Sequence, residues 1–112
     1  MLKDELLVWS IGRHTHRYGT RFRVWWVGGE RDGELLWTST DWEADIDHPL
    51  DPPVTMAAGT GFRWECAFDN PTEQTLVFGP RATDEMCILF GSFAAVGEDA
   101  QVGPQSCYRF AP

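Results

Sequence analysis

Hydrophobic and polar residues alternate over several short stretches of this chain. In the clearest stretch, residues 62–69, every second position is hydrophobic: Phe62, Trp64, Cys66 and Phe68. Residues 21–27 alternate in the same way, with hydrophobic residues opposite a face that carries two arginines. Because successive side chains of a β-strand point to opposite faces, this period predicts strands that each bury one face.

Shorter hydrophobic runs predict further strands at residues 6–10, 34–40, 54–58, 75–78 and 86–93. A glycine-rich loop at residues 28–33 predicts a hairpin. Residues 41–53 are acidic and contain three prolines, and they predict a long, partly irregular connection. Helical periodicity is confined to a turn or two. The pattern as a whole predicts an all-β fold, an antiparallel, jelly-roll-like β-sandwich.

Length and charge narrow the class of protein. The 112 residues fit a single domain over 1–112, and the six Trp and seven Phe indicate a packed core. A net charge of −8 disfavours nucleic acid as a partner, because its phosphates are also negative. No hydrophobic run approaches the roughly 20 residues of a membrane span, and residues 1–10 lack the layout of a signal peptide.

The candidate chemistry centres on His14 and His16. In an extended backbone, residues two apart point to the same face and lie about 6–7 Å apart, so both imidazoles can reach one metal ion. Two exposed surface histidines are the competing interpretation, and for this pair alone it is the better one. Met86, by itself, is equally well explained as a residue that fills a gap in the core.

Together the three residues predict a copper site. Imidazole binds several transition metals, but a thioether selects Cu(I) over zinc. His14, His16 and Met86 would leave one position of the ion open, as a catalytic metal site requires. Cys87 follows Met86 and so points to the opposite side of its strand, towards the core face that carries Cys66. A disulfide between these two cysteines is geometrically feasible, and two free buried thiols are the alternative.

Several segments, in order, resemble the C-terminal catalytic domain of the copper type II, ascorbate-dependent monooxygenases. The family includes peptidylglycine α-hydroxylating monooxygenase and dopamine β-monooxygenase. The resemblance extends from about Ile11 to Cys107. The matching segments are His14-Thr15-His16-Arg17-Tyr18-Gly19, Cys66-Ala67-Phe68-Asp69-Asn70, Gly79, Asp84-Glu85-Met86-Cys87 and Cys107.

The resemblance implies a monooxygenase domain that hydroxylates a C–H bond with dioxygen and an ascorbate-type reductant. It implies that His14, His16 and Met86 hold the oxygen-activating copper, one ion per chain, and that Cys66 and Cys87 form a disulfide. It also implies a secreted, periplasmic or secretory-pathway location. Cys107 is the third cysteine, and its counterpart in the family pairs with a cysteine upstream of the histidine motif, where this chain has none.

Two departures from the family pattern shape the expected function. The family holds a second copper with three histidines of an N-terminal domain, but His48 is the only further histidine here. We therefore expect the chain to be a fragment that needs that domain as a partner, in the same chain or in trans, for turnover. At two positions where members of the family contact a peptide substrate, this chain has Gly12 and Phe90. The sequence therefore does not identify the small-molecule substrate. The alternative is a copper-binding or structural β-sandwich without turnover.

Overall fold

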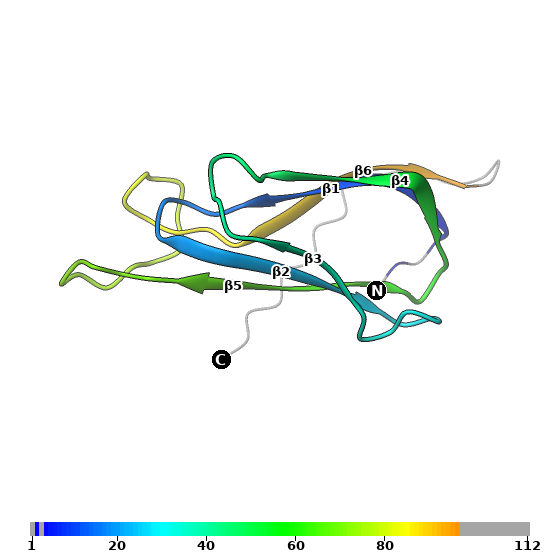
Figure 1. The fold of residues 1–112 in the computed structure, drawn as a ribbon, viewed down its shortest axis with the longest axis horizontal. Coiled ribbons are helices and arrows are strands. Elements are labelled where there is room, and N and C mark those ends of the chain that lie inside the picture. The colour runs from blue at the N-terminus through cyan, green and yellow to red at the C-terminus, as the bar shows by residue number, and fades with distance from the viewer. Residues whose placement is uncertain (1, 3, 97–112) are drawn as a thin grey trace.

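The chain folds into two three-stranded antiparallel β-sheets that pack face to face. A computed structural model describes residue 2 and residues 4–96. One sheet has the strand order β4-β1-β6 and the other β3-β2-β5, and Figure 1 shows them as two layers. The strand bounds are β1 Leu6–His14, β2 Gly19–Val27, β3 Leu35–Ser39, β4 Asp47–Met56, β5 Gly61–Phe68 and β6 Ile88–Ala95. The predicted all-β sandwich is confirmed, and the described residues contain no helix.

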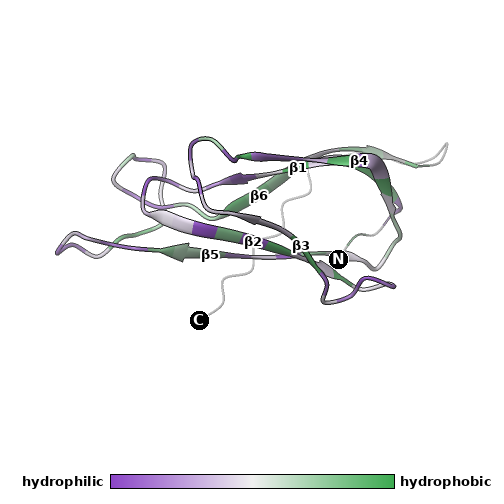
Figure 2. Ribbon diagram, viewed as in Figure 1, coloured by the Kyte–Doolittle hydropathy of each residue, from purple (hydrophilic) through white to green (hydrophobic). Residues whose placement is uncertain are grey.

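The core lies between the two sheets and takes residues from both. Its buried members are Val8, Ile11, Phe22, Val24, Trp26, Trp37, Leu50 and Met56. Figure 2 shows hydrophobic residues along β6, hydrophilic bands alternating with hydrophobic ones along β2, and hydrophilic residues in the hairpin loop after β2. Since each sheet buries one face, the period-two pattern of residues 21–27 and 62–69 follows directly from the sandwich. No helix that could span a membrane occurs in the described part of the chain.

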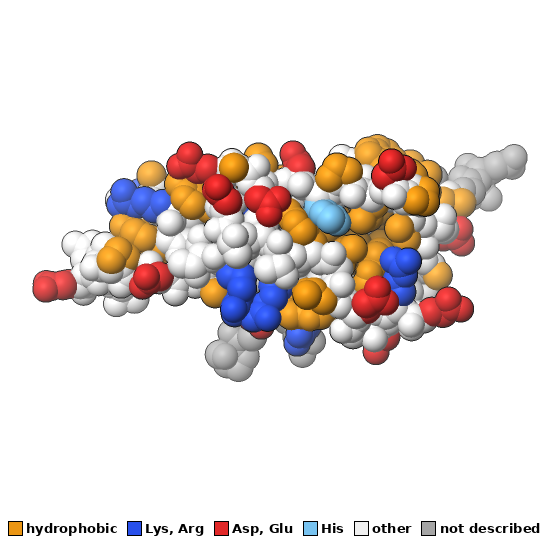
Figure 3. All heavy atoms as spheres, in the orientation of Figure 1, with side chains coloured by type: hydrophobic (Ala, Val, Ile, Leu, Met, Phe, Trp, Pro, Cys, Tyr) orange, Lys and Arg blue, Asp and Glu red, His pale blue; other side chains and the backbone are white. Residues whose placement is uncertain are grey.

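The outer face of β2 and β5 is basic and aromatic. Arg21 and Arg23 form ion pairs with Glu65 at 3.9 and 3.5 Å, and the Arg63 guanidinium lies 4.3 Å from the centre of the Trp25 ring. Figure 3 shows acidic side chains scattered over one face of the molecule and a cluster of basic ones along its lower edge. The predicted basic outer face of residues 21–27 is therefore partly neutralised by the neighbouring strand.

The predicted irregular connection at residues 41–53 is confirmed for residues 41–46 but wrong for residues 47–53, because β4 begins at Asp47. β4 is an edge strand, where a proline on the open side costs no internal hydrogen bond, and Pro52 and Pro53 fall where the pairing of β4 with β1 shifts register, between Pro49 and Val54. The Asp51–Pro52 peptide bond is cis. The predicted strand at residues 75–78 is also wrong, since that segment makes only one isolated bridge, from Phe78 to Glu85.

Strand direction gathers three connections at one end of the sandwich. The turn after β1, the loop after β3 and the long segment after β5 all lie there, on the side opposite the β2–β3 hairpin (Figure 1). The first of these connections carries the histidine motif and the third carries Met86. The antiparallel pairing therefore brings together segments about 70 residues apart in sequence.

Candidate metal centre

The two histidines of the motif lie at the end of β1. His14 is the last residue of the strand and is exposed, whereas His16 is half-buried in the turn that leads to β2. Their ring centres are 5.1 Å apart and the rings are nearly perpendicular, at 84°. Thr15 between them points inward and is buried. The alternation expected from their spacing thus brings both imidazoles to one place.

The segment that carries Met86 runs alongside His16. In the pairing of β1 with β6, His14 lies opposite Ile88. Continuing this antiparallel register by two residues pairs position 16 with position 86. The backbone N–H groups of His16 and Met86 both donate to Oε1 of Glu85, at 2.8 and 3.3 Å. The structure therefore brings the histidine turn and the methionine segment side by side, and Met86 itself is half-buried.

Glu85 is a buried carboxylate that connects these two segments. Glu85 is only 6% exposed, and its Oε2 accepts a hydrogen bond from the backbone N–H of Tyr18 at 2.9 Å. The sequence analysis gave Glu85 no role of its own. The one signal in the sequence was an acidic residue directly before Met86 and a predicted strand. A charge next to a strand that buries one face is costly unless hydrogen bonds compensate it.

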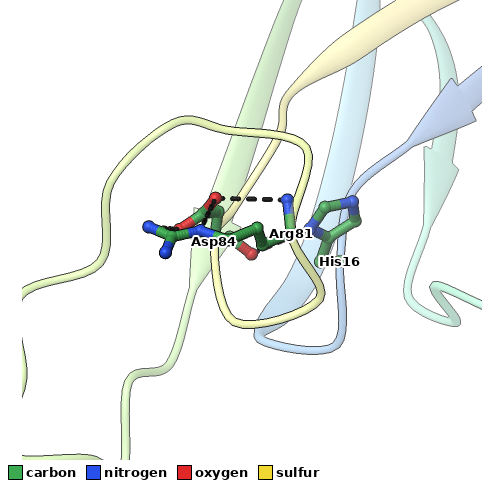
Figure 4. Close-up of polar contacts among 3 residues, drawn as sticks. All are labelled: His16, Arg81 and Asp84. Carbon is green, nitrogen blue, oxygen red and sulfur yellow. Dashed lines mark hydrogen bonds and ion pairs between the residues drawn. The ribbon is translucent and has the colours of Figure 1, made fainter.

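His16 is oriented by the loop that precedes Glu85. Its Nδ1 lies 2.8 Å from the carbonyl oxygen of Asp84. A carbonyl can only accept, so Nδ1 carries the proton and Nε2 keeps the lone pair with which an imidazole binds metal. Figure 4 shows the His16 ring beside the loop that holds Arg81 and Asp84.

The Asp84 side chain accepts hydrogen bonds from Arg81 across that loop. Both the backbone N–H and Nε of Arg81 donate to Asp84 Oδ2, each at 3.1 Å (Figure 4). The hydrogen bond from the Arg81 side chain lowers the pKa of Asp84, although burial of the carboxylate opposes this shift. The carboxylate therefore stays ionised and fixes the carbonyl that orients His16.

Arg13 lies on the inner side of the same strand and is almost fully buried, at 1% exposure. Its Nη2 donates to Thr15 Oγ1 at 2.6 Å, and its Nη1 donates to Ser39 Oγ at 2.8 Å. Burial lowers the pKa of Arg13, and the carboxylates of Asp45 and Asp41 raise it. This cation ties the histidine strand to β3 of the other sheet, and the sequence analysis did not identify it.

A cavity of about 340 Å³ opens next to His16. Its other lining residues are Arg17, Trp42, Pro80, Ala82 and Thr83. It is formed by all three connections that meet at this end of the sandwich, so it adjoins the candidate metal centre. His48 lies elsewhere, on β4, where it is half-buried and stacked on the core residue Trp37 with ring centres 5.3 Å apart.

Cys66 and Cys87 form a disulfide, with their sulfur atoms bonded at 2.06 Å. Both residues pack against the core, as the alternation of their strands predicted. The bond joins β5 to the residue that follows Met86, so it anchors the methionine segment to the second sheet. Cys107 lies outside the described residues.

The two altered family positions face each other across strands. Gly12 of β1 pairs with Phe90 of β6, and a Cβ on Gly12 would overlap the Phe90 ring. Gly12 is thus required by a close approach of this ring. Phe90 remains 47% exposed, on the same side of the sheet as His14.

The donor set at this end fits a soft or borderline transition metal. Among the residues that the structure describes, no three His, Cys, Asp or Glu side chains gather as a metal-binding group. The thioether of Met86 is half-buried on the adjoining segment, and a thioether is a soft donor of the kind that favours copper over zinc.

Fold and site together define an all-β domain with a candidate imidazole–thioether centre at one end. The family model for the copper type II ascorbate-dependent monooxygenase, C-terminal domain, matches residues 1–110. The chain belongs to this family. A search of curated proteins found no match to it.

Proposed function

We propose that His14, His16 and Met86 hold one copper ion and that the domain is the oxygen-activating half of a monooxygenase. The observation that carries the proposal is the placement of the Met86 segment against His16, through the hydrogen bonds of His16 to Asp84 and Glu85. Two imidazoles and a thioether suit an ion that alternates between Cu(II) and Cu(I). Membership of the family supports the same metal and an ascorbate-type reductant.

The residues around the centre have separate tasks in this reaction. Copper, when bound, would supply the one-electron chemistry by which dioxygen, two electrons from the reductant and two protons convert a C–H bond to C–OH, with the second oxygen atom leaving as water. The Asp84 carbonyl holds the His16 ring with Nε2 free. The cavity beside His16 admits the C–H bond of a small molecule next to the centre.

Turnover requires a partner. Hydroxylation consumes two electrons, and a single copper delivers one. The only other histidine of the chain, His48, is stacked on Trp37. We propose that an N-terminal copper domain supplies the second electron, in the same chain or in trans. The Cys66–Cys87 disulfide supports an oxidising compartment, such as the secretory lumen, periplasm or exterior, as the site of action.

Copper titration of the purified chain tests the ligand set. Metal analysis after desalting should give one tightly bound copper per chain. Replacing Met86 by Ile keeps bulk but removes the sulfur, so Cu(I) affinity should fall while the fold survives, as measured by circular dichroism. His48→Gln is the matched control and should bind copper as the unaltered chain does. Unchanged Cu(I) affinity in Met86→Ile would leave Met86 a packing residue only.

Turnover measurements separate the enzyme from a copper-binding domain without activity. With ascorbate and oxygen, the isolated chain should release peroxide slowly and form no hydroxylated product in stoichiometric amount. Adding a domain with its own copper should give coupled hydroxylation. Coupled product from the isolated chain would contradict the division of labour, and no product with any second domain would favour the non-catalytic alternative.

A further inference from the structure

We propose that Glu85 is a positioning residue whose carboxylate sets the spacing between His16 and Met86, the two half-buried ligands of the copper centre. The inference rests on the proposed function for its metal, but the contacts that carry it belong to the metal-free protein. The Glu85 side chain forms no hydrogen bond with the side chain of His14, His16 or Met86. It acts on the backbones of His16 and Met86.

A single oxygen atom joins the two segments. Glu85 Oε1 accepts the backbone N–H of His16 at 2.8 Å and that of Met86 at 3.3 Å. Met86 directly follows Glu85 in the chain, so the bond from His16, 69 residues away, is the one that fixes how near the two backbones approach. Oε2 takes the N–H of Tyr18 at 2.9 Å, which adds the start of the following strand to the same group.

The backbone of Glu85 is itself held in place by two hydrogen bonds. The backbone N–H of Glu85 donates to the Val77 carbonyl at 2.8 Å, and the Glu85 carbonyl accepts the N–H of Gly79 at 3.1 Å. These bonds tie the Glu85 backbone to a third stretch of chain and aim its side chain across to the histidine turn. The group is therefore a rigid connection between segments 67–69 residues apart in sequence.

Charge and burial show why the residue is a carboxylate. No ion pair to Glu85 occurs within residues 4–96, although the residue is only 6% exposed. A buried carboxylate without a cation is stable only where several N–H groups point at it, as the three here do. A neutral Gln offers one oxygen and one NH₂ group, so it must face at least one of these three N–H donors with a donor of its own.

Hydrogen exchange of the metal-free protein tests the contact. In Glu85→Ala the backbone amides of His16, Tyr18 and Met86 should exchange at least about tenfold faster than in the unaltered chain, since each loses its acceptor. The amides that pair β2 with β5 should keep their protection and so report an intact fold. Glu65→Gln, which changes an exposed carboxylate of β5, is the control and should leave the three amides unchanged.

Copper binding tests the consequence. Loss of a group that orients metal ligands typically lowers affinity about 10- to 100-fold, and we expect a loss of that size in Cu(I) affinity for Glu85→Ala. X-ray absorption of the Cu(I)-loaded variant should show a weakened or absent copper–sulfur contribution, which a merely structural defect in a folded domain would not produce. Glu85→Gln should change both readouts in the same direction by a smaller amount, and it serves if the alanine variant fails to fold.

The outcomes separate this inference from the proposed function. Unchanged Cu(I) affinity and an unchanged copper–sulfur signal in a folded Glu85 variant would overturn the positioning role. Unchanged exchange of the His16 and Met86 amides would overturn the contact itself. If the unaltered chain binds no copper through sulfur, the proposed function fails, and the exchange experiment alone still decides whether Glu85 holds the two segments together.

Discussion

The two ends of the sandwich are closed in different ways. At the hairpin end, β2 and β3 are joined by a loop whose hydrogen bonds are local, such as Gly33 N–H to Trp26 O at 2.8 Å and Trp26 N–H to Glu34 O at 2.9 Å. At the other end, which we call the site end, side chains of Arg13 and Glu85 bond residues 26 to 69 positions away. The hairpin end can form from its own sequence, whereas the site end forms only when both sheets are in place.

This difference indicates at which end of the sandwich a substitution would affect the candidate metal centre as well as the stability of the fold. The bonds of Arg13 to Ser39, of His16 to Asp84 and Glu85, and of Tyr18 to Glu85 connect segments that the strands must first bring together, so the candidate metal centre depends on the whole fold. The hairpin loop depends on contacts between near neighbours in sequence, with positive φ at Gly28, Gly29 and Gly33 and a hydrogen bond from the Gly28 N–H to Asp32 Oδ1 at 2.7 Å. Substitutions at the site end should therefore disturb the candidate metal ligands, and substitutions at the hairpin end should lower stability without affecting them.

The largest effect should follow loss of the disulfide. Cys66→Ala combined with Cys87→Ala opens a link between residues 21 apart and should lower the free energy of unfolding by about 3 kcal/mol, because the unfolded chain gains freedom. Urea unfolding measures the loss. Amide exchange should increase near Met86 before it increases in the hairpin. A loss below about 1 kcal/mol would show that the disulfide does not hold the site end.

Thr15→Val should have the next largest effect. Valine keeps the shape of threonine but removes the oxygen that accepts from the buried Arg13 guanidinium at 2.6 Å. A hydrogen bond to a charged group contributes about 2 kcal/mol, and unfolding in urea should show a loss of that size. Thr38→Val on the exposed side of β3 is the control. Equal stability of the two variants would mean that Arg13 finds another acceptor.

At the hairpin end, Gly33→Ala should cost about 1 kcal/mol. Gly33 has φ +81°, which an L-residue with a Cβ adopts at that cost, and nothing lies within 4 Å of the added methyl group. Asparagine tolerates this conformation better, so Gly33→Asn should lose less. Copper affinity should be unchanged in both variants. A loss of copper binding here would contradict the independence of the two ends.

The smallest effect concerns Asp41 in the loop after β3. Its carboxylate accepts the N–H groups of Ala44 and Glu43, and these bonds lower the pKa of Asp41. A lowered pKa in the folded state means that the contribution to stability is complete above the unfolded pKa of about 3.9 and disappears as pH falls through the folded value. Carbon NMR titration should give a midpoint below that of an unfolded peptide, and Asp41→Asn should remove this part of the pH dependence of stability.

The period-two pattern was enough to predict most strands, because a residue's place on the inner or outer face depends only on its neighbours. Residues 21–27 and 62–69 correspond closely to β2 and β5. The pattern failed at residues 47–53, where prolines indicated a loop but an edge position in the sheet allows a strand. Whether a segment lies at the edge of a sheet depends on the positions of all the other strands, so the local sequence does not predict it.

The same division holds for the candidate metal centre. The sequence by itself determined the spacing of His14 and His16 and the alternation of Met86 with Cys87, since both follow from the geometry of an extended backbone. Only the tertiary structure decided that Glu85 joins His16 to Met86 and that Arg13 is buried beneath Thr15. The bond from His16 to Glu85 joins residues 69 positions apart, and its formation depends on the register and packing of two sheets, which no stretch of sequence specifies alone.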